Sequence, residues 1–468
     1  MSLKKTDPVP ELLREALTRL ESEFSALPEF QSTHSAQAGD AGYTEVLADV
    51  ASRLGDNYPY FHPLYAGQML KPPHPVARTA YALAMKINPN NHARDGGRAS
   101  SAMEIEAVHE IAAMFGWKEF LGHLTSGGTF ANLEALWVAG QERPGQRIVA
   151  SAQAHYTHQR ISAVLGLRFD SVAADASGRM ELNALEDELK RGDVGTVVAT
   201  LGTTAIGAVD PLEEILALQS RYNFRVHVDS AYGGYFKLIP EALDEPARRA
   251  YALIDRADSI VIDPHKHGLQ PYGCGCILFR SPEVGRFYKH DSPYTYFTSS
   301  SLHLGEISLE CSRAGAAAVA LWATQRLLPL VPNGQFAAEL KAGRMAALEL
   351  DKRIRGDERF TPLAAGRPEL DIVVWKLRDE GARHTTEAAS LAQKVFDLSA
   401  ERNLHLALVK LPRRWFEECT QGKSIQEKSS QEESITCLRS VLMKPEHLEW
   451  IGPIWETLSA ATEEALKS

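Results

Sequence analysis

The sequence has few cysteines and lacks long apolar runs. Five cysteines stand among 468 residues, an odd number that does not suit a disulfide framework in a chain of this length. No apolar stretch approaches the ~20 residues that a membrane-spanning helix requires. The N-terminal stretch has two lysines without an apolar segment behind them, so no secretory signal is expected. Together these features predict a cytoplasmic protein that does not enter a membrane.

The sequence also lacks clustered basic residues and a dinucleotide-binding motif. The net charge is -10 and the basic residues are scattered, which argues against nucleic acid or an anionic membrane as a partner. No G-x-G-x-x-G follows the first predicted strand, which argues against a bound dinucleotide. Cys274 and Cys276 form a C-x-C pair in the apolar run GCGCILFR, without a second pair elsewhere. We therefore interpret them as part of a buried strand and expect no metal.

Strand and helix patterns alternate through the middle of the chain. Short apolar runs, from RIVAS at 147–151 to GCGCILFR at 273–280, are separated by helical patterns such as PLEEILALQSRYN. This alternation is typical of an α/β fold with a mostly parallel sheet covered on both faces, whose ligands bind at the carboxyl ends of the strands. Ser101 and Glu104 match a capping box, which predicts that a helix begins there with Ile105 on its apolar face.

We predict three parts from the changes in pattern. They are an N-terminal helical interface segment at 1–85, a large α/β domain at 86–330 and a small C-terminal α+β domain at 331–468. The first part contains the stretch NYPYFHPLYAGQMLKPPHPVA, which has too many prolines for a single helix. In the last part, the polar run at 417–434 has too few apolar residues to order itself and is predicted to be a mobile loop.

Two predicted strand ends and one helix start carry residues of chemical interest. Gly128 and Thr129 lie where a helix begins, and the backbone N–H groups and dipole there favour a phosphate, although Ser-Gly-Gly-Thr is also an ordinary turn. Asp229 ends an apolar strand, where a carboxylate could bind a metal, cap a helix or hold a protonated ring nitrogen. The small Ala231 leaves room for a flat ring. Lys266 follows another strand.

Lys266 and the threonines of TLGTT complete the pattern. At the binding edge of a sheet, desolvation makes a lysine amine nucleophilic toward an aldehyde, whereas the alternative for Lys266 is a solvated loop residue. Thr203 and Thr204 end a strand and are expected to offer hydroxyls to the same edge. An anion site, an acid and an amine are what pyridoxal phosphate requires, so we predict this cofactor.

The segments HVDSAYGG and DPHKHG resemble the group II pyridoxal-phosphate-dependent amino-acid decarboxylases, which act on aromatic amino acids, histidine, glutamate and cysteine sulfinate. The likeness runs from about residue 58 to 445, and the His-Lys pair after proline is its most specific motif. It implies fold type I, PLP-dependent transferase-like, with a mostly parallel seven-stranded sheet. It also implies a Schiff base on Lys266, decarboxylation of an L-amino acid to the amine and CO2, and a homodimer whose N-terminal segment wraps the other subunit.

The resemblance implies a role for each matching residue. Asp229 would pair with the pyridine nitrogen, His265 would contact the cofactor, and Ala231 would pack under its ring. Tyr65 is expected to line the substrate pocket, together with Gln68, His92 and Arg98. The other implied contacts are with the phosphate (Gly128, Thr129), the ring substituents (Thr204), the second face of the ring (His155) and the substrate carboxylate (Arg439). A structural salt bridge is the alternative for that arginine.

The sequence departs from the family pattern in two places and leaves the reaction open in a third. His267 stands where many relatives carry an aromatic residue or methionine, and Asp263 stands where asparagine is frequent. A mobile loop of the family often carries a tyrosine, and the matching region at 289–306 holds Tyr294 and Tyr296, with Phe297 close by. A phenylalanine at that position shifts relatives toward oxidative chemistry.

Three readings therefore stay open. The loop tyrosine or His155 is the candidate for the acid that protonates the substrate α-carbon in a decarboxylase. The first alternative is another pyridoxal-phosphate enzyme, such as an aldolase, a lyase or an oxidative deaminase. The second is a non-catalytic relative, which is disfavoured by the joint presence of four residues: Thr204, Asp229, His265 and Lys266.

Overall fold

The structure is a computed structural model. It describes residues 7–29, 39–92, 95–289, 307–364, 366–378, 385–416 and 434–467. The predicted loop residues Tyr294, Tyr296 and Phe297 lie outside the described residues, as does nearly all of the polar run that begins at 417. Within the described part of the chain, no helix is both long enough and apolar enough to cross a membrane.

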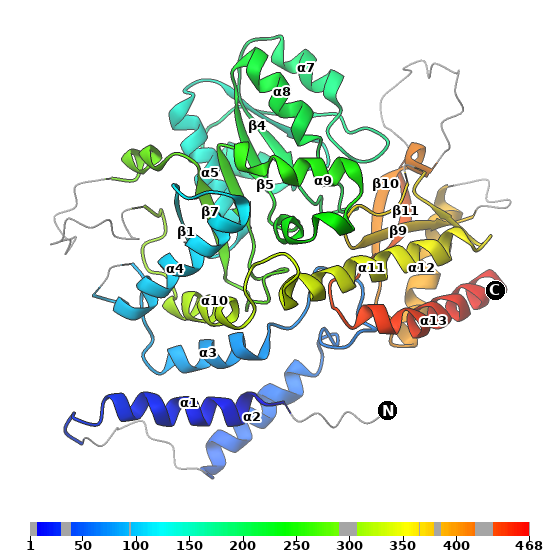
Figure 1. Ribbon diagram of the computed structural model, residues 1–468. Helices are drawn as coiled ribbons and strands as arrows, with labels where there is room; N and C mark the ends of the chain where they lie inside the picture. Colours follow the sequence, from blue (N-terminus) through cyan, green and yellow to red (C-terminus); the bar gives the residue numbers. More distant parts are fainter. Residues whose placement is uncertain are drawn as a thin grey trace.

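The centre of the molecule is a seven-stranded sheet in the order β1-β7-β6-β5-β4-β2-β3 (Figure 1). Strands β6, β5, β4, β2 and β3 run parallel, whereas β7 is antiparallel to both of its neighbours. The predicted mostly parallel seven-stranded sheet is confirmed, with β7 as its antiparallel member. The strands are β1 Leu121–Thr125, β2 Arg147–Ser151, β3 Phe169–Val172, β4 Val194–Thr200, β5 Arg225–Asp229, β6 Ser259–Ile262 and β7 Gly275–Phe279.

Helices cover both faces of this sheet because both faces are apolar. In β6, Ile260 and Ile262 join the cluster that holds α4, α8 and α9, whereas Val261 packs under α5 on the opposite face. Figure 1 shows α7, α8 and α9 on one side of the strands and α5 on the other. The helices are α4 Arg98–Phe115, α5 Gly128–Glu142, α6 Thr157–Val164, α7 Leu182–Leu189, α8 Leu212–Tyr222, α9 Glu245–Ala252 and α10 Gly315–Leu327.

The C-x-C pair lies in the buried part of the sheet, as predicted. Cys276 belongs to β7 and Cys274 directly precedes it, and both thiols are buried. Gly275 between them is required by packing, because a Cβ there would come within 2.6 Å of the Cα of Gly127. Gly275 therefore lets β7 pass directly against the turn that precedes α5.

The small domain is a four-stranded antiparallel sheet in the order β10-β11-β9-β8. One face packs on α11, α12 and α13, where Trp375 and Leu438 are fully buried. The other face, with Ile372 and Val374, joins the core of the large domain. The elements are β8 Phe360–Pro362, β9 Ile372–Leu377, β10 Ala407–Pro412, β11 Ser434–Val441, α11 Gln335–Arg355, α12 Thr385–Glu401 and α13 His447–Lys467.

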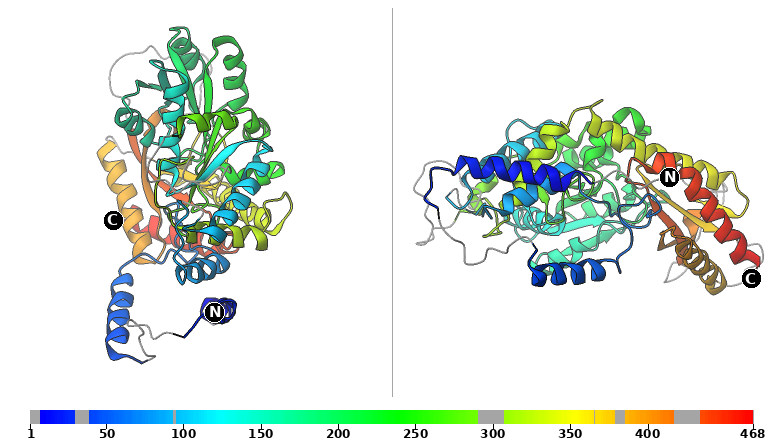
Figure 2. Two further views of the ribbon diagram at one scale, coloured as in Figure 1. Left: turned by 90° about the vertical axis from the view of Figure 1, so that its left-hand side faces the viewer. Right: turned by 90° about the horizontal axis from the view of Figure 1, so that it is seen from below.

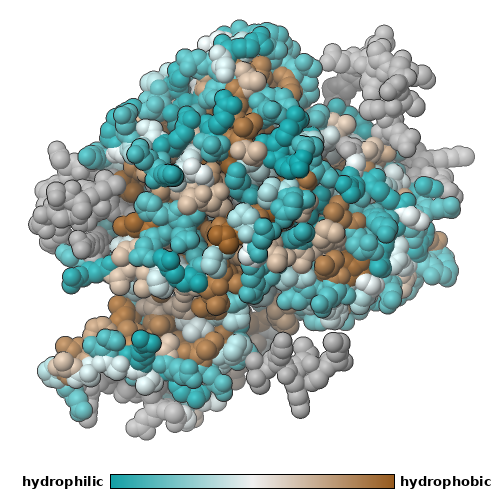
Figure 3. Space-filling model, viewed as in Figure 1, coloured by the Kyte–Doolittle hydropathy of each residue, from teal (hydrophilic) through white to brown (hydrophobic). Residues whose placement is uncertain are grey.

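The N-terminal helices α1 (Val9–Glu23), α2 (Ala41–Leu54) and α3 (Pro75–Met85) lie below the large domain. Helix α1 packs on α3, and α3 packs on α10. Helix α2 has no buried residue and extends away from the rest of the chain (Figure 2). In Figure 3, hydrophobic side chains gather on the N-terminal helices and on the neighbouring lower face of the molecule.

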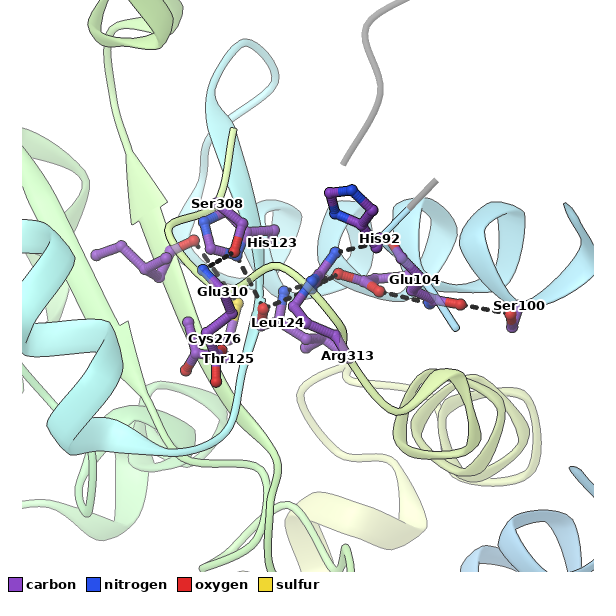
Figure 4. Close-up of polar contacts among 12 residues, drawn as sticks. His92, Ser100, Glu104, His123, Leu124, Thr125, Cys276, Ser308, Glu310 and Arg313 are labelled. Carbon is purple, nitrogen blue, oxygen red and sulfur yellow. Dashed lines mark hydrogen bonds and ion pairs between the residues drawn. The ribbon is translucent and has the colours of Figure 1, made fainter. Parts of the chain in front are cut away.

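The exposed edge of β1 is covered by an ion pair rather than by another strand (Figure 4). The carboxylate of Glu104 accepts from the backbone N–H of Leu124 at 3.0 Å, and Arg313 donates to the carbonyl of Leu124 at 2.7 Å. Arg313 and Glu104 are themselves 2.6 Å apart, and both side chains are buried. The pair therefore fixes the peptide that lies just before the turn into α5.

This arrangement corrects the predicted capping box. Helix α4 begins at Arg98, after Gly97, so Ser101 lies within its first turns instead of before them. Glu104 does not reach back to the helix start because β1 and Arg313 bind its carboxylate. Ile105, expected on the apolar face, is 44% exposed.

The Glu104→Gln variant is expected to lose about 3 kcal/mol of unfolding free energy, because it leaves the buried guanidinium of Arg313 without its counter-charge. Urea denaturation measures this loss. The matched control is Glu106→Gln on the same helix, which weakens an exposed pair with Arg326 and should cost much less. Equal losses in the two variants would contradict the proposed role of the ion pair.

Candidate active site

The carboxyl ends of β4, β5 and β6 and the start of α5 enclose a cavity of about 460 Å³. Its position agrees with the rule that parallel sheets bind ligands at the carboxyl edge. The sequence-predicted residues that line this cavity are Gly128, Thr129, His155, Thr204, Asp229, Ala231, His265 and Lys266. The structure thus brings together residues that lie far apart in the sequence, since Gly128 and Lys266 are separated by 138 positions.

Asp229 is the last residue of β5, and its carboxylate is held inside the protein. His158 Nε2 lies 2.8 Å from its Oδ2, and the N–H of Ala231 donates to its Oδ1 at 3.1 Å. Burial alone would raise the pKa of Asp229, but the hydrogen bond and charge of His158 outweigh burial and hold this pKa well below its ordinary value. Asp229 therefore remains a carboxylate, and His158 donates to it.

A second set of buried polar residues is connected to this carboxylate by hydrogen bonds. Asn132 on α5 donates to Asp229 at 3.4 Å, and its side-chain oxygen accepts from His227 Nε2 at 2.8 Å. The other ring nitrogen of His227 lies 2.8 Å from the hydroxyl of Ser259. Burial lowers the pKa of His227 to about 3, so its ring is neutral and can donate to only one of these partners.

This support was not predicted from the sequence. His158 stands three residues after His155, in the segment that leads from β2 into α6, and this closeness is the one signal that could have indicated it. Asn132 and His227 carry no such signal. They meet only because α5 packs against β5 and β6.

Lys266 lies in the loop after β6 and is only partly buried. Its Nζ lies 3.0 Å from Oδ2 of Asp263, and the side chain is 23% exposed. His265 Nε2 is 3.5 Å from the same oxygen, and burial lowers the pKa of His265, which leaves its ring neutral. The amine of Lys266 and the carboxylate of Asp263 therefore lie together at one wall of the cavity.

The turn before α5 is shaped to receive a group close to the backbone. Gly127 has a φ of +153°, and a Cβ on Gly128 would lie 2.6 Å from the carboxylate of Asp263. Ser126 donates its N–H to Glu310 at 2.9 Å, which fixes the start of the turn. The beginning of a fifteen-residue helix adds positive potential at this end of the cavity.

Two further walls come from the loops after β2 and β4. His155 has its Nδ1 2.8 Å from the hydroxyl of Thr157, its ring lies against Tyr156, and burial lowers its pKa. Thr204 lines the cavity, but Thr203 does not, because its hydroxyl is buried and accepts from the N–H of Ala208 at 3.0 Å. The expectation for Thr203 is therefore wrong.

The predicted substrate residues are not among those that line this cavity. Arg439 on β11 is buried, and it donates to Gln68 at 3.0 Å and to the carbonyl of Thr204 at 2.7 Å. Tyr65 is buried under the ammonium of Lys444, which lies 5.2 Å from its ring centre. Neither of them is among the residues that line the cavity, and neither are Gln68, His92 and Arg98.

The residues present fit pyridoxal phosphate. Three buried polar atoms at the cavity have no hydrogen-bond partner among the described residues: Thr200 Oγ1, Asp263 Oδ1 and His265 Nδ1. Unpaired buried groups are costly, so their grouping here favours a bound polar molecule. An ionised Asp229, an amine at Lys266 and a helix start lie around the same space. These match the ring nitrogen, the aldehyde and the phosphate of the cofactor.

Comparison with known proteins supports the same conclusion. A family model described as the pyridoxal-dependent decarboxylase conserved domain matches residues 58–378. The L-tyrosine decarboxylase of Enterococcus faecium is 26% identical over 86% of this chain and 85% of that protein. The L-2,4-diaminobutyrate decarboxylase of Rhizobium meliloti (strain 1021) is 36% identical over 44% of each chain.

Solved structures share the fold. The crystal structure of mouse CSAD has a TM-score of 0.77 at 20% identity, covering 98% of this chain and 99% of that chain. The crystal structure of Oryza sativa TDC with PLP and tryptamine also has a TM-score of 0.77, at 17% identity and 99% coverage of each chain. The chain belongs to the pyridoxal-dependent decarboxylase family, of fold type I, and pyridoxal phosphate is its cofactor.

Proposed function

We propose that this protein decarboxylates an L-amino acid to the amine and CO2, with the amine of Lys266 as the group that bonds the cofactor aldehyde. The observation that carries the proposal is the convergence of Lys266, the ionised Asp229 and the start of α5 on one cavity. When bound, the cofactor supplies an electron sink for the bond that breaks at the substrate α-carbon. The family model and the decarboxylases that share sequence with this chain support this reaction.

Asp229 has the role of holding a proton on the ring nitrogen. Its carboxylate stays ionised because His158 and the Ala231 N–H bind it, so it can stabilise a positive charge placed opposite. Asn132 limits the positions that the carboxylate can take. All of these contacts come from the protein's own groups, which is the preorganisation that electrostatic catalysis requires.

The other residues orient the cofactor. Gly128 and Thr129 would bind the phosphate at the start of α5, where Gly128 leaves space for close approach. His155 and Ala231 would lie on opposite faces of the ring, with Thr204 and His265 at its edge. His155, whose Nδ1 is bound by Thr157, is the described candidate for the acid at the α-carbon, a role that requires its protonated form although burial lowers its pKa. Substrate contacts by Arg439 and Tyr65 stay predictions.

The Lys266→Ala variant is expected to lose CO2 release and the visible absorbance of lysine-bound cofactor while its circular dichroism spectrum is unchanged, because no other cavity residue is an amine. The matched control is Lys237→Ala, which removes a half-buried lysine that binds the carbonyl of Tyr251 outside the cavity. Wild-type turnover by Lys266→Ala would refute the proposal. Screening wild type against the common amino acids for CO2 and H2O2 separates decarboxylation from oxidative deamination.

The Asp229→Asn variant should still bind cofactor, but its rate of CO2 release should fall about a hundredfold or more. An amide cannot hold the proton of the ring nitrogen as an ionised carboxylate does. Because the pKa of Asp229 lies below its ordinary value, the wild-type rate should not show an Asp229 titration above about pH 4. Steady-state kinetics with saturating cofactor measure the effect, and near-normal turnover would make Asp229 a structural residue.

We also propose a cytoplasmic homodimer in which the N-terminal ~85 residues wrap the other subunit. An exposed apolar face of α2 supports the dimer, since residues with helical spacing share it: Tyr43, Val46, Leu47, Val50 and Leu54. Nearby, Tyr58 and Phe61 are exposed, whereas Tyr65 packs within its own chain. The expected interface exceeds ~2,000 Å², as in permanent assemblies. Buried free thiols at Cys274, Cys276 and Cys437 fit a reducing compartment.

The Leu47→Asp variant is expected to dissociate the dimer and to lose activity, because it places a charge in the apolar face of α2. Sedimentation velocity at low micromolar concentration, with an activity assay at the same concentration, measures both effects. Ser52→Asp, on the same helix but off this face, should remain dimeric and active. A fully active wild-type species with the mass of one chain would rule out the dimer.

A further inference from the structure

One small-domain carboxylate lies buried against the two segments that carry the cofactor residues. Asp371 directly precedes β9 and is 1% exposed. The hydroxyl of Tyr232 donates to its Oδ1 at 2.6 Å, and Nε2 of His267 lies 3.3 Å from its Oδ2. Both of these partners belong to the large domain, 139 residues away in sequence in the case of Tyr232.

The two partners occupy equivalent places beside the proposed site. Tyr232 directly follows Ala231, and His267 directly follows Lys266. Their rings also touch, with centres 4.7 Å apart at 63°. Asp371 therefore contacts the residue after the proposed ring-packing alanine and the residue after the proposed cofactor lysine.

The charges around Asp371 favour a carboxylate there. Lys71 and Arg344 face it from two other segments, and Arg439 lies on the neighbouring strand. Burial raises the pKa of Asp371 to about 6 despite the hydrogen bond from Tyr232, so the group is ionised above neutral pH. Burial also lowers the pKa of His267 well below its ordinary value, so the histidine is neutral. The contact therefore joins a carboxylate to two neutral groups that carry donor hydrogens.

His267 is also one of the two departures from the family pattern. Its ring is enclosed by Tyr232 and Phe236, with centres at 4.7 Å and 5.2 Å, and its side chain is 1% exposed. It does not line the cavity, whereas Lys266 beside it does. Neither ring nitrogen of His267 has a hydrogen-bond partner among the described residues, and the carboxylate of Asp371, 3.3 Å from Nε2, is the charged group beside it.

We propose that Asp371 is a positioning residue that holds the Ala231–Tyr232 and Lys266–His267 segments at a fixed separation, and thereby sets the affinity for pyridoxal phosphate. The inference rests on the proposed function. It assigns to the small domain a part in cofactor binding that does not require any of its side chains to enter the cavity. Loss of the carboxylate leaves the hydroxyl of Tyr232 without its hydrogen-bond partner and removes the negative charge beside the ring of His267, so both segments lose a fixed point.

The test compares Asp371→Leu with Asp371→Asn in the full-length protein, with the dissociation constant of pyridoxal phosphate measured by fluorescence titration. Asp371→Leu is expected to raise this constant about tenfold or more. Asp371→Asn should stay within about threefold, because its amide can accept from Tyr232 and donate to a neutral His267. A wild-type constant in Asp371→Leu would overturn the inference, and so would equal losses in both variants.

The control for general destabilisation is Asp351→Leu. Asp351 lies on α11, is buried to a similar extent and pairs with Arg355 at 2.8 Å, away from the cavity. The Asp351→Leu variant should have a lower midpoint of thermal unfolding than wild type, with an unchanged affinity for pyridoxal phosphate. If both leucine variants weaken binding equally, the effect belongs to stability and the inference fails.

If Asp371→Leu does not fold, His267→Leu carries the test, because His267 is outside the cavity wall and can act only through the segment of Lys266. It is expected to weaken binding about threefold or more, and unchanged affinity would overturn the inference. The readout also separates this inference from the proposed function. Wild type that binds pyridoxal phosphate but releases no CO2 would defeat the proposed function alone, whereas unchanged affinity in the variants would defeat this inference alone.

Discussion

The architecture of the site depends on keeping one negative charge, that of Asp229, inside the protein at the end of β5. Burying an isolated carboxylate costs several kcal/mol, so the charge persists only because donors surround it. His158 comes from α6, Asn132 from α5 and the N–H of Ala231 from the loop that follows β5. The packing of α5 and α6 on one face of the sheet is therefore also what makes an ionised acid possible at the sheet edge.

A second buried carboxylate of the site belongs to Asp263, which lies between Lys266 and the start of α5. Its carboxylate is 3.0 Å from the amine and would contact any side chain larger than hydrogen at position 128. An asparagine at this place could not neutralise a lysine. Asp263 therefore balances the charge of Lys266 within the protein, and the positive potential at the start of α5 favours an anion nearby.

The sequence was most informative where local pattern and chemistry coincide. Asp229 and Lys266 could be predicted because each follows an apolar strand, and parallel strands bring their ends to one edge. Thr203 was misplaced because a turn between strands fixes its hydroxyl on the N–H of Ala208, which strand periodicity does not encode. Ser101 and Glu104 matched a cap, but the free edge of β1 attracts the carboxylate. Pairings such as Tyr232 with Asp371 depend on the docking of two domains and leave no local signal.

The contacts of the small domain also bear on how a substrate is recognised. Arg439 and Asp371 bind the carbonyl of Thr204 and the hydroxyl of Tyr232, so both act on the cavity wall from behind. Once the cofactor roles are assigned, the described lining residues that remain are Ser126, Gly127, Phe130, Asn132, Thr157, Thr200, Gly202, Tyr232 and Asp263. Phe130 and Tyr232 are the aromatic side chains among them, and Asp263 already pairs with Lys266. Because Asp371 holds Tyr232 and Arg439 holds Thr204, the shape of this wall depends on how the small domain packs against the large one.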